Sequence, residues 1–392
     1  MKVEQIYALA NDITKEVLGK TGVVAEDLSN VVDMGQEIIN TNNLDNYVKS
    51  LIDHIGKVVF VNRPYSGSAP SVLMDGWEYG SILEKVTMDA YPEATENDTW
   101  KLVSGQSYDP NVFTAPTVSA KFFNKRTTFE IPMSFAEKQV KSAFDSAQQL
   151  NSFFSMIETA IGNSMTIKTD SLIMSTINNM TAETLHHAAA DGKYGNVSTN
   201  TAVNLLKLYN ARFGTSLKAD TAVTDKEFIR WASFQIGLYA DRLKKLSTLF
   251  NVGGKERFTA PDKLHLVMLS EFAKSAEAYL YGDTYNEQYN KLPKAELVPY
   301  WQGSGTNYDF SATSKIHVTN AGHTVEASGI LAVMFDRDAL GVTNQDRRVT
   351  SNYNPRGEFF NNWYKFDCGY FNDLNENFIV FYVADSVADS VA

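Results

Sequence analysis

The chain has 392 residues, which corresponds to two or three lobes at a typical domain size of about 100–200 residues. Hydrophobic residues make up 44% and charged residues 21% of it, a balance typical of a folded protein rather than a disordered one. A net charge of −11 excludes a protein whose whole surface grips nucleic acid, because phosphate binding requires a cationic surface.

The amino-terminal segment begins with an acid, Glu4, where a signal peptide would begin its apolar core. The longest apolar runs, at 330–335 and 378–384, are shorter than the roughly 18 residues that a membrane span needs. We therefore expect a protein made in the cytosol that has no contact with a membrane.

The first 50 residues are interpreted as an arm that packs on something else. Apolar residues recur at three- and four-residue steps over 3–17, which predicts a short helix ending near Gly19. Residues 20–44 are polar and follow no sustained period. A second short helix at 46–55 and a strand at 58–61 are expected next.

Residues 76–89 and 117–132 are predicted to be strands, and the span between them is polar and rich in proline. Two strands joined by such a long connection form an extended hairpin. An isolated two-stranded ribbon is marginally stable in water, because it has little to pack against. The hairpin therefore needs a partner surface, which another subunit can provide.

This hairpin also carries two clusters of opposite charge. The basic cluster is Lys121, Lys125 and Arg126, and the acidic cluster in the connection is Glu93, Glu96 and Asp98. One interpretation is a solvated ribbon face. The other is that the hairpin lies across a neighbouring copy and is registered by the opposite charges, which makes these six residues candidates for inter-subunit contact.

A long helix is predicted directly after Pro132, because no further proline occurs before Pro261. Ser134 and Glu137 have the spacing of a capping box, and apolar residues follow at helical steps as far as Ile161. This pattern predicts a helix of about 28 residues that acts as a structural beam.

The remaining segments mix helices and strands without regular alternation, which indicates an α+β fold. Helices are predicted at 201–213, ending at Gly214, from the Thr224–Glu227 capping box to about 250, and at 271–281. Strands are predicted at 264–269 and near 314–319, 329–335, 345–350, 362–370 and 377–383.

Motifs for chemistry are weak throughout the sequence. Gly19-Lys20-Thr21 lacks the earlier glycine of a phosphate loop, and the six histidines lack metal-ligand spacing. The single cysteine, Cys368, excludes an intramolecular disulfide, and its aromatic neighbours predict a buried thiol. A hydrolase built on paired carboxylates has no specific support, so we predict no catalytic residue, no cofactor and no metal site.

Five segments resemble tailed-phage major capsid proteins of the Hong Kong 97 type, and more closely those of small short-tailed phages of Gram-positive hosts. They are FVNRPY at 60–65, WEYGSILEK at 77–85, FFNKRTTFEIP at 122–132, LAVMFDRDA at 331–339 and the aromatic segment 363–383. The resemblance covers most of the chain and contains no catalytic motif.

The resemblance implies a domain plan. Residues 1–50 would form the amino-terminal arm, and residues 60–132 the extended loop. The peripheral domain, with its long spine helix, would comprise 51–59, 133–199 and 351–392. The axial domain would comprise 200–350.

The resemblance also implies a function as a virion capsid protein. The chain would assemble with itself as pentamers and hexamers into an icosahedral shell around double-stranded DNA, with portal and scaffolding proteins as partners and only weak, non-specific contact with the DNA. Some relatives crosslink a loop lysine, a role that Lys121 or Lys125 would hold by position alone. The alternatives are an encapsulin-like compartment and a phage tail protein.

Overall fold

The computed structural model describes most of the chain after residue 115 and short stretches before it. The described residues are 11–16, 19, 33, 69, 72–74, 83–88, 91–94, 96, 101–108, 111, 113, 115–139, 147–189, 198–281, 295–301, 315–320 and 322–385. The chain divides into two compact units. Unit 1 comprises Met1–Glu78, Arg126–Ile173 and Val342–Gly369, and unit 2 comprises Tyr79–Lys125, Met174–Gly341 and Tyr370–Ala392.

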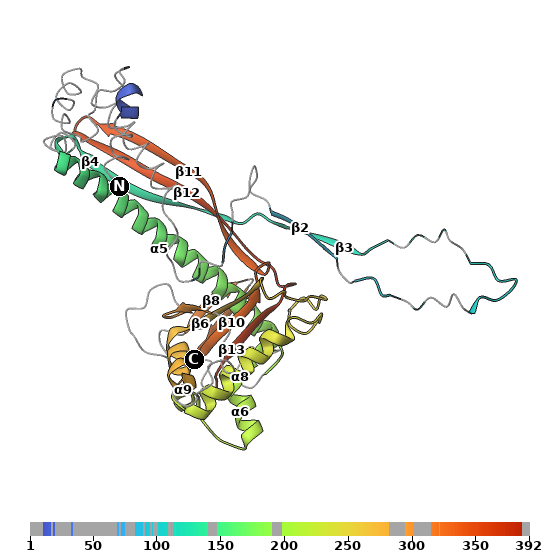
Figure 1. The fold of residues 1–392 in the computed structure, drawn as a ribbon. Coiled ribbons are helices and arrows are strands. Elements are labelled where there is room, and N and C mark those ends of the chain that lie inside the picture. The colour runs from blue at the N-terminus through green and yellow to red at the C-terminus, as the bar shows by residue number, and fades with distance from the viewer. Residues whose placement is uncertain are drawn as a thin grey trace. The chain divides into compact units, whose positions relative to one another are not determined.

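Unit 1 contains a four-stranded sheet in the order β1-β11-β12-β4 (Figure 1). Its long strands are β4 (Arg126–Ala136), β11 (Leu340–Asn354) and β12 (Phe359–Asn372), and β1 (Leu73–Met74) pairs in parallel with β11. Burial alternates along most of β4 and β12, as expected for antiparallel strands with one covered face. Phe129 and Phe366 lie opposite each other on these two strands, with ring centroids 5.2 Å apart.

Helix α5 (Ala147–Ala188) has 42 residues, or about 60 Å at the usual rise per residue, so the predicted end near Ile161 is wrong. The continuation is rich in threonine, which hides the apolar period in the sequence. Thr176 and Thr184 are nevertheless buried, and the Thr184 hydroxyl donates to the Met180 carbonyl one turn earlier, 2.8 Å away. Threonine therefore serves as core in this helix.

The predicted capping box at Ser134 and Glu137 is also wrong. Ser134 lies within β4, and its hydroxyl donates to the Asn361 Oδ1 atom at 2.6 Å. Helical geometry begins at residue 137, where the Gln139 side chain accepts a hydrogen bond from the Ala136 amide at 3.1 Å. The strand continues past Pro132 because β12 offers a partner along its whole length.

Unit 2 is built around a five-stranded mixed sheet in the order β5-β13-β10-β6-β7. The strands are β5 (Ala202–Asn204), β6 (Leu264–Leu269), β7 (Glu296–Val298), β10 (Ile330–Asp336) and β13 (Phe378–Tyr382). Every residue of β10 and β13 is buried, so this sheet is covered on both faces and forms the core of the unit.

Three predicted helices are present in unit 2 as α6 (Leu205–Phe213), α8 (Lys226–Arg242) and α9 (Ser270–Tyr281). Helix α8 ends before the predicted end near residue 250, and the short helix α7 (Ala219–Ala222) was not predicted. Helix α6 ends at Gly214, whose φ of 66° is the left-handed conformation that glycine adopts readily. Helix α8 is capped by Asp225, which accepts from the Phe228 amide, instead of by the predicted Thr224. Tyr239 of α8 packs edge-on against Phe381 of β13 at 5.4 Å.

The predicted extended hairpin is present in unit 2 as a two-stranded ribbon, β2 (Leu83–Met88) paired with β3 (Val118–Phe123). The predicted strand 117–132 is divided into two strands. Strand β3 ends before Asn124 and Lys125, and the chain continues after them as β4 in the other sheet. A second hairpin, β8 (Ile316–Asn320) with β9 (His323–Ala327), completes the unit. Figure 1 shows the ribbon projecting away from the five-stranded sheet.

The two units differ from the expected domain boundaries in several respects. The boundary divides α5 between Ile173 and Met174, and residues 60–78, 126–132 and 342–350 group with unit 1. Strand β13 pairs with β10 and β5, so the closing strand belongs with the five-stranded sheet and not with the rest of 351–392.

Most of the predicted arm, 1–50, lies outside the described residues. Within it, residues 11–16 are helical and Gly19 has a φ of 68°, which agrees with a helix that ends there.

No helix among the described residues is long and apolar enough to cross a membrane.

Candidate functional site

The ribbon β2–β3 has two chemically different faces. Residues directly opposite each other in an antiparallel pair share a face, so Val86 lies beside Ala120 on one face and Lys85 beside Lys121 on the other. The face that we call the outer face is apolar and exposed: 62% of Val86, 55% of Val118 and 63% of Phe122 is accessible to solvent. The same face also carries the exposed carboxylate of Glu84, opposite Phe122. Its apolar side chains stabilise the protein only when another surface covers them.

The opposite face of the ribbon is fixed to its own unit by a group of charged side chains. We call this group the root cluster, and it consists of Lys85, Lys121, Arg257, Asp373 and Glu376. The Asp373 carboxylate receives the Lys85 ammonium at 2.9 Å and the Lys121 ammonium at 2.7 Å. Its side chain is only 2% exposed, so these ion pairs are little screened by solvent.

The root cluster continues along β2. Lys85 also pairs with Glu376 at 2.9 Å, and Glu376 pairs with Arg257 at 3.2 Å. The Arg257 guanidinium donates to the Met88 carbonyl at 3.2 Å. Further along the chain, the Glu256 carboxylate accepts from the Tyr91 amide at 3.0 Å. The strand is therefore held at three successive points.

A tight turn between β12 and β13 positions Asp373. The Asp373 amide donates to the Ala339 carbonyl at 2.7 Å, and its carboxylate accepts from the Asn375 amide at 3.1 Å. Burial raises the pKa of Asp373, but Lys121 and Lys85 lower it by more, so its pKa lies below the ordinary value. The carboxylate is consequently charged at neutral pH. A Cβ at Gly253, beside this turn, would collide with the Asn375 side chain, so a larger residue there would require that side chain to move.

The connection between the strands of the ribbon exposes further apolar side chains. Leu102 and Tyr108 are more than half exposed, and Phe113 is almost fully exposed. Val103 and Gln106 close a turn in which Gly105 adopts a φ of 89°. These side chains extend the apolar character of the outer face into the connection.

The six residues predicted for inter-subunit contact are distributed differently. Lys121 is already paired with Asp373 in its own chain. Lys125 and Arg126 are exposed at the break between β3 and β4, and Glu93 and Glu96 are exposed in the connection. Asp98 lies outside the described residues. Of the basic cluster, Lys121 alone joins the root cluster, because Lys125 and Arg126 follow the end of β3.

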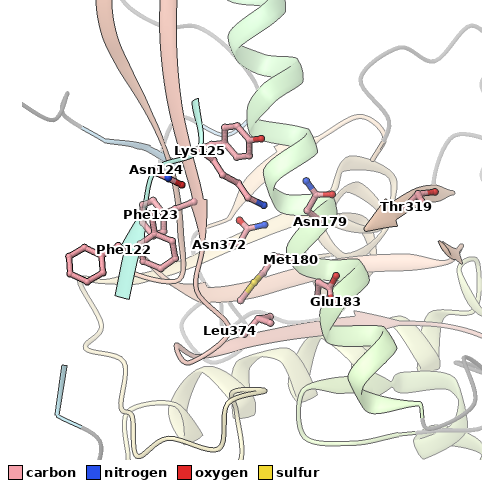
Figure 2. Close-up of a pocket in the computed structure, with 12 residues that line it drawn as sticks. Phe122, Phe123, Asn124, Lys125, Asn179, Met180, Glu183, Thr319, Asn372 and Leu374 are labelled. Atoms are coloured by element: carbon pink, nitrogen blue, oxygen red, sulfur yellow. The ribbon is translucent and has the colours of Figure 1, made fainter. Parts of the chain in front are cut away.

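Lys125 extends into a pocket of about 510 Å³ in unit 2. Figure 2 shows Lys125 directed from the end of β3 toward α5, where Asn179 and Glu183 line the opposite wall. Phe123, Asn372 and Leu374 also line the pocket. Phe123 packs on Phe371, with ring centroids 5.2 Å apart. The pocket offers amides, one cation and one anion beside an aromatic wall.

Sequence reasoning missed four residues of the root cluster: Lys85, Arg257, Asp373 and Glu376. The strand pattern could have indicated Lys85, because in the predicted strand it lies two residues from both Leu83 and Thr87 and therefore on the same face as they do. The partner shared by Lys85 and Lys121, Asp373, is far away along the chain: it follows Lys121 by 252 residues and Lys85 by 288 residues. No periodicity in a single sequence predicts such a meeting.

Cys368 is buried, as predicted, and its thiol donates to the Asn344 Oδ1 atom at 3.3 Å. Burial raises its pKa to about 12, which keeps the thiol protonated and unreactive.

His186 and His323 stack with ring centroids 3.8 Å apart. Within the described residues, no group of three or more His, Cys, Asp or Glu side chains is arranged to hold a metal ion.

Comparison with known proteins agrees with the resemblance seen in the sequence. The family model described as Phi29-like phage major capsid protein matches residues 10–382. No curated protein matches the chain. A chain from the capsid structure of Staphylococcus phage Andhra superposes with a TM-score of 0.52 at 10% identity, over 82% of this chain and 86% of that one.

A chain from the mature capsid of bacteriophage PhiM1 superposes with a TM-score of 0.44 at 10% identity, over 82% of this chain and 88% of that one. The likeness to the Andhra chain supports the predicted α+β fold of the Hong Kong 97 type. Because the family model spans nearly the whole chain, the protein belongs to the Phi29-like phage major capsid proteins and is a structural component of the virion.

Proposed function

We propose that the chain assembles as pentamers and hexamers into an icosahedral shell that encloses double-stranded DNA. The observation that carries this proposal is the outer face of the ribbon, where Val86, Val118 and Phe122 are all exposed on one face. A neighbouring copy in a closed shell would bury this face in every subunit alike. The role is structural, with no catalytic step.

We propose the following domain roles on the same basis. Unit 1, with the four-stranded sheet and the first part of the spine helix α5, serves as the peripheral domain. The five-stranded sheet of unit 2 and its helices form the axial domain. Residues 79–125 form the extended loop, which is shorter than the expected 60–132 because β1 and the start of β4 belong to the four-stranded sheet. Residues 1–50 form the arm. This division places β13 in the axial domain because of its pairing with β10.

The charged residues of the loop and its root contribute a second contact between copies. We propose that Lys125 and Arg126 of one subunit meet Glu93, Glu96 and Asp98 of another. Lys125, Arg126, Glu93 and Glu96 are exposed, which supports this role, whereas Lys121 already has a carboxylate partner in its own chain. Opposite charges at the rim of an interface favour the correct register more than they add to affinity.

The acidic composition bears on how strongly the shell binds the DNA inside it. A charge of −11 per chain, repeated over many copies, gives a wall that encloses DNA and adheres to it weakly. We propose that scaffolding protein and portal protein assist assembly, as partners of the inner surface and of one vertex.

The contents of purified particles test this proposal. We expect particles from an infected culture to protect double-stranded DNA from nuclease. Particles that hold protein and no DNA would indicate an encapsulin-like compartment instead, and tubes or rings would indicate a tail component. Disrupted particles serve as the control, because their DNA should become sensitive to nuclease.

A further inference from the structure

The Lys85 and Lys121 side chains form an unusual pair in the ribbon. They are directly opposite each other on β2 and β3, and they lie on the same face. Like charges in directly opposed positions destabilise a strand pair. The repulsion between the two ammonium groups would therefore weaken the ribbon at this pair unless an anion lay between them.

Asp373 provides that anion. One carboxylate oxygen contacts Lys85 at 2.9 Å and the other contacts Lys121 at 2.7 Å, so a single side chain bridges both strands. Lys85 also donates to the Asp338 carbonyl at 3.0 Å. Asp373 is fixed to the domain by its own turn, so the bridge joins the two strands to each other and both strands to the domain.

The rest of the root cluster prevents β2 from turning about this bridge. Glu376 receives both Lys85 and Arg257, and its side chain is 9% exposed. Arg257 holds the backbone of β2 at Met88, three residues beyond Lys85. A strand held at two separated points on one face cannot rotate freely about either, so the outer face remains directed away from the domain.

We propose that the root cluster is a latch that sets the direction of the ribbon, with Asp373 as the residue that binds both strands. By fixing the inner face, the cluster presents the outer face to a neighbouring copy in one orientation before assembly begins. Only this consequence for assembly rests on the proposed function. The latch itself is a property of the isolated subunit.

Hydrogen exchange of the unassembled full-length subunit tests the latch. In Asp373→Asn, amides of β2 and β3 should exchange at least about tenfold faster, because the carboxylate that bridges Lys85 and Lys121 is lost and only Lys85 keeps a second one, Glu376. Amides of β10 and β13 should keep their protection. Glu84→Gln is the matched control, since Glu84 is exposed in the same strand on the outer face, and it should change nothing.

A double variant separates a latch from a general loss of packing. Lys121→Met removes the repulsion that Asp373→Asn exposes, so the pair Lys121→Met/Asp373→Asn should exchange more slowly in the ribbon than Asp373→Asn alone. Unchanged exchange in Asp373→Asn would overturn the proposal. So would an equal loss of protection in β10 and β13, or a double variant no slower than the single one. Because no shell is needed, these outcomes are independent of the proposed function.

Discussion

Replacing Val86 and Phe122 together by aspartate should abolish the closure of shells while the subunit stays folded. Both side chains are more than 60% exposed in the single chain, so charging them costs the folded monomer little beyond the repulsion between Glu84 and the aspartate opposite it at position 122. In an interface the same carboxylates would be buried without partners, at several kcal/mol each. Since about 1.4 kcal/mol is a factor of ten, we expect at least a roughly hundredfold loss of closed shells.

Sedimentation of the purified variant measures this loss. The protein should remain as soluble subunits or capsomers, with the circular dichroism spectrum of the wild type. Val86→Ile/Phe122→Leu is the control, because it keeps an apolar face of similar size and should still give shells. Normal closed shells from the aspartate variant would show that the outer face is not buried between copies.

The proposed charge contact can be measured in the same assay with a double-mutant cycle. Reversing Arg126 and Glu96 separately should weaken assembly, and reversing both should restore part of it if the two residues meet across the interface. Strictly additive effects would remove this pair from the account.

The second large effect is expected in the core of unit 2. Phe381 is completely buried in β13, between β10 and β5, and it packs on Tyr239 of α8. Phe381→Ala should lower the free energy of unfolding by about 3–5 kcal/mol, because it removes apolar contacts and leaves a cavity. This is a large share of the roughly 5–15 kcal/mol that stabilises a typical protein.

Denaturant unfolding of the unassembled subunit gives this value directly. Phe234→Ala is the matched control, since Phe234 lies on α8 with 62% of its surface exposed, and it should change the free energy by less than about 0.5 kcal/mol. Equal effects of the two substitutions would contradict the position of β13 inside the sheet, between β5 and β10.

Elements with a strong local signal were predictable from the sequence. Strand β6 was predicted with its observed bounds, and Gly214 ends α6 as its left-handed conformation requires. The ribbon was predicted because its two strands flank a proline-rich span. In each case the information lies within a few residues, in hydrophobic period or in turn chemistry.

Other features depend on partners far away in the sequence. Ser134 lies in a strand because β12 pairs with it, which overrides a good capping pattern. The length of α5 was underestimated because buried threonines look polar in sequence. The root cluster depends on the register between Lys85 and Lys121 and on a turn near the end of the chain, so its residues could be found only in three dimensions.

The central claim is that copies of this chain form the wall of a closed shell. Negative-stain electron microscopy of the purified full-length protein, with its elution volume from a sizing column, tests that claim most directly. The account predicts closed isometric particles that elute in the void volume, or capsomers that close into such particles when scaffolding protein is added. A protein that remains a monomer or small oligomer under both conditions, or that forms tubes, would contradict it.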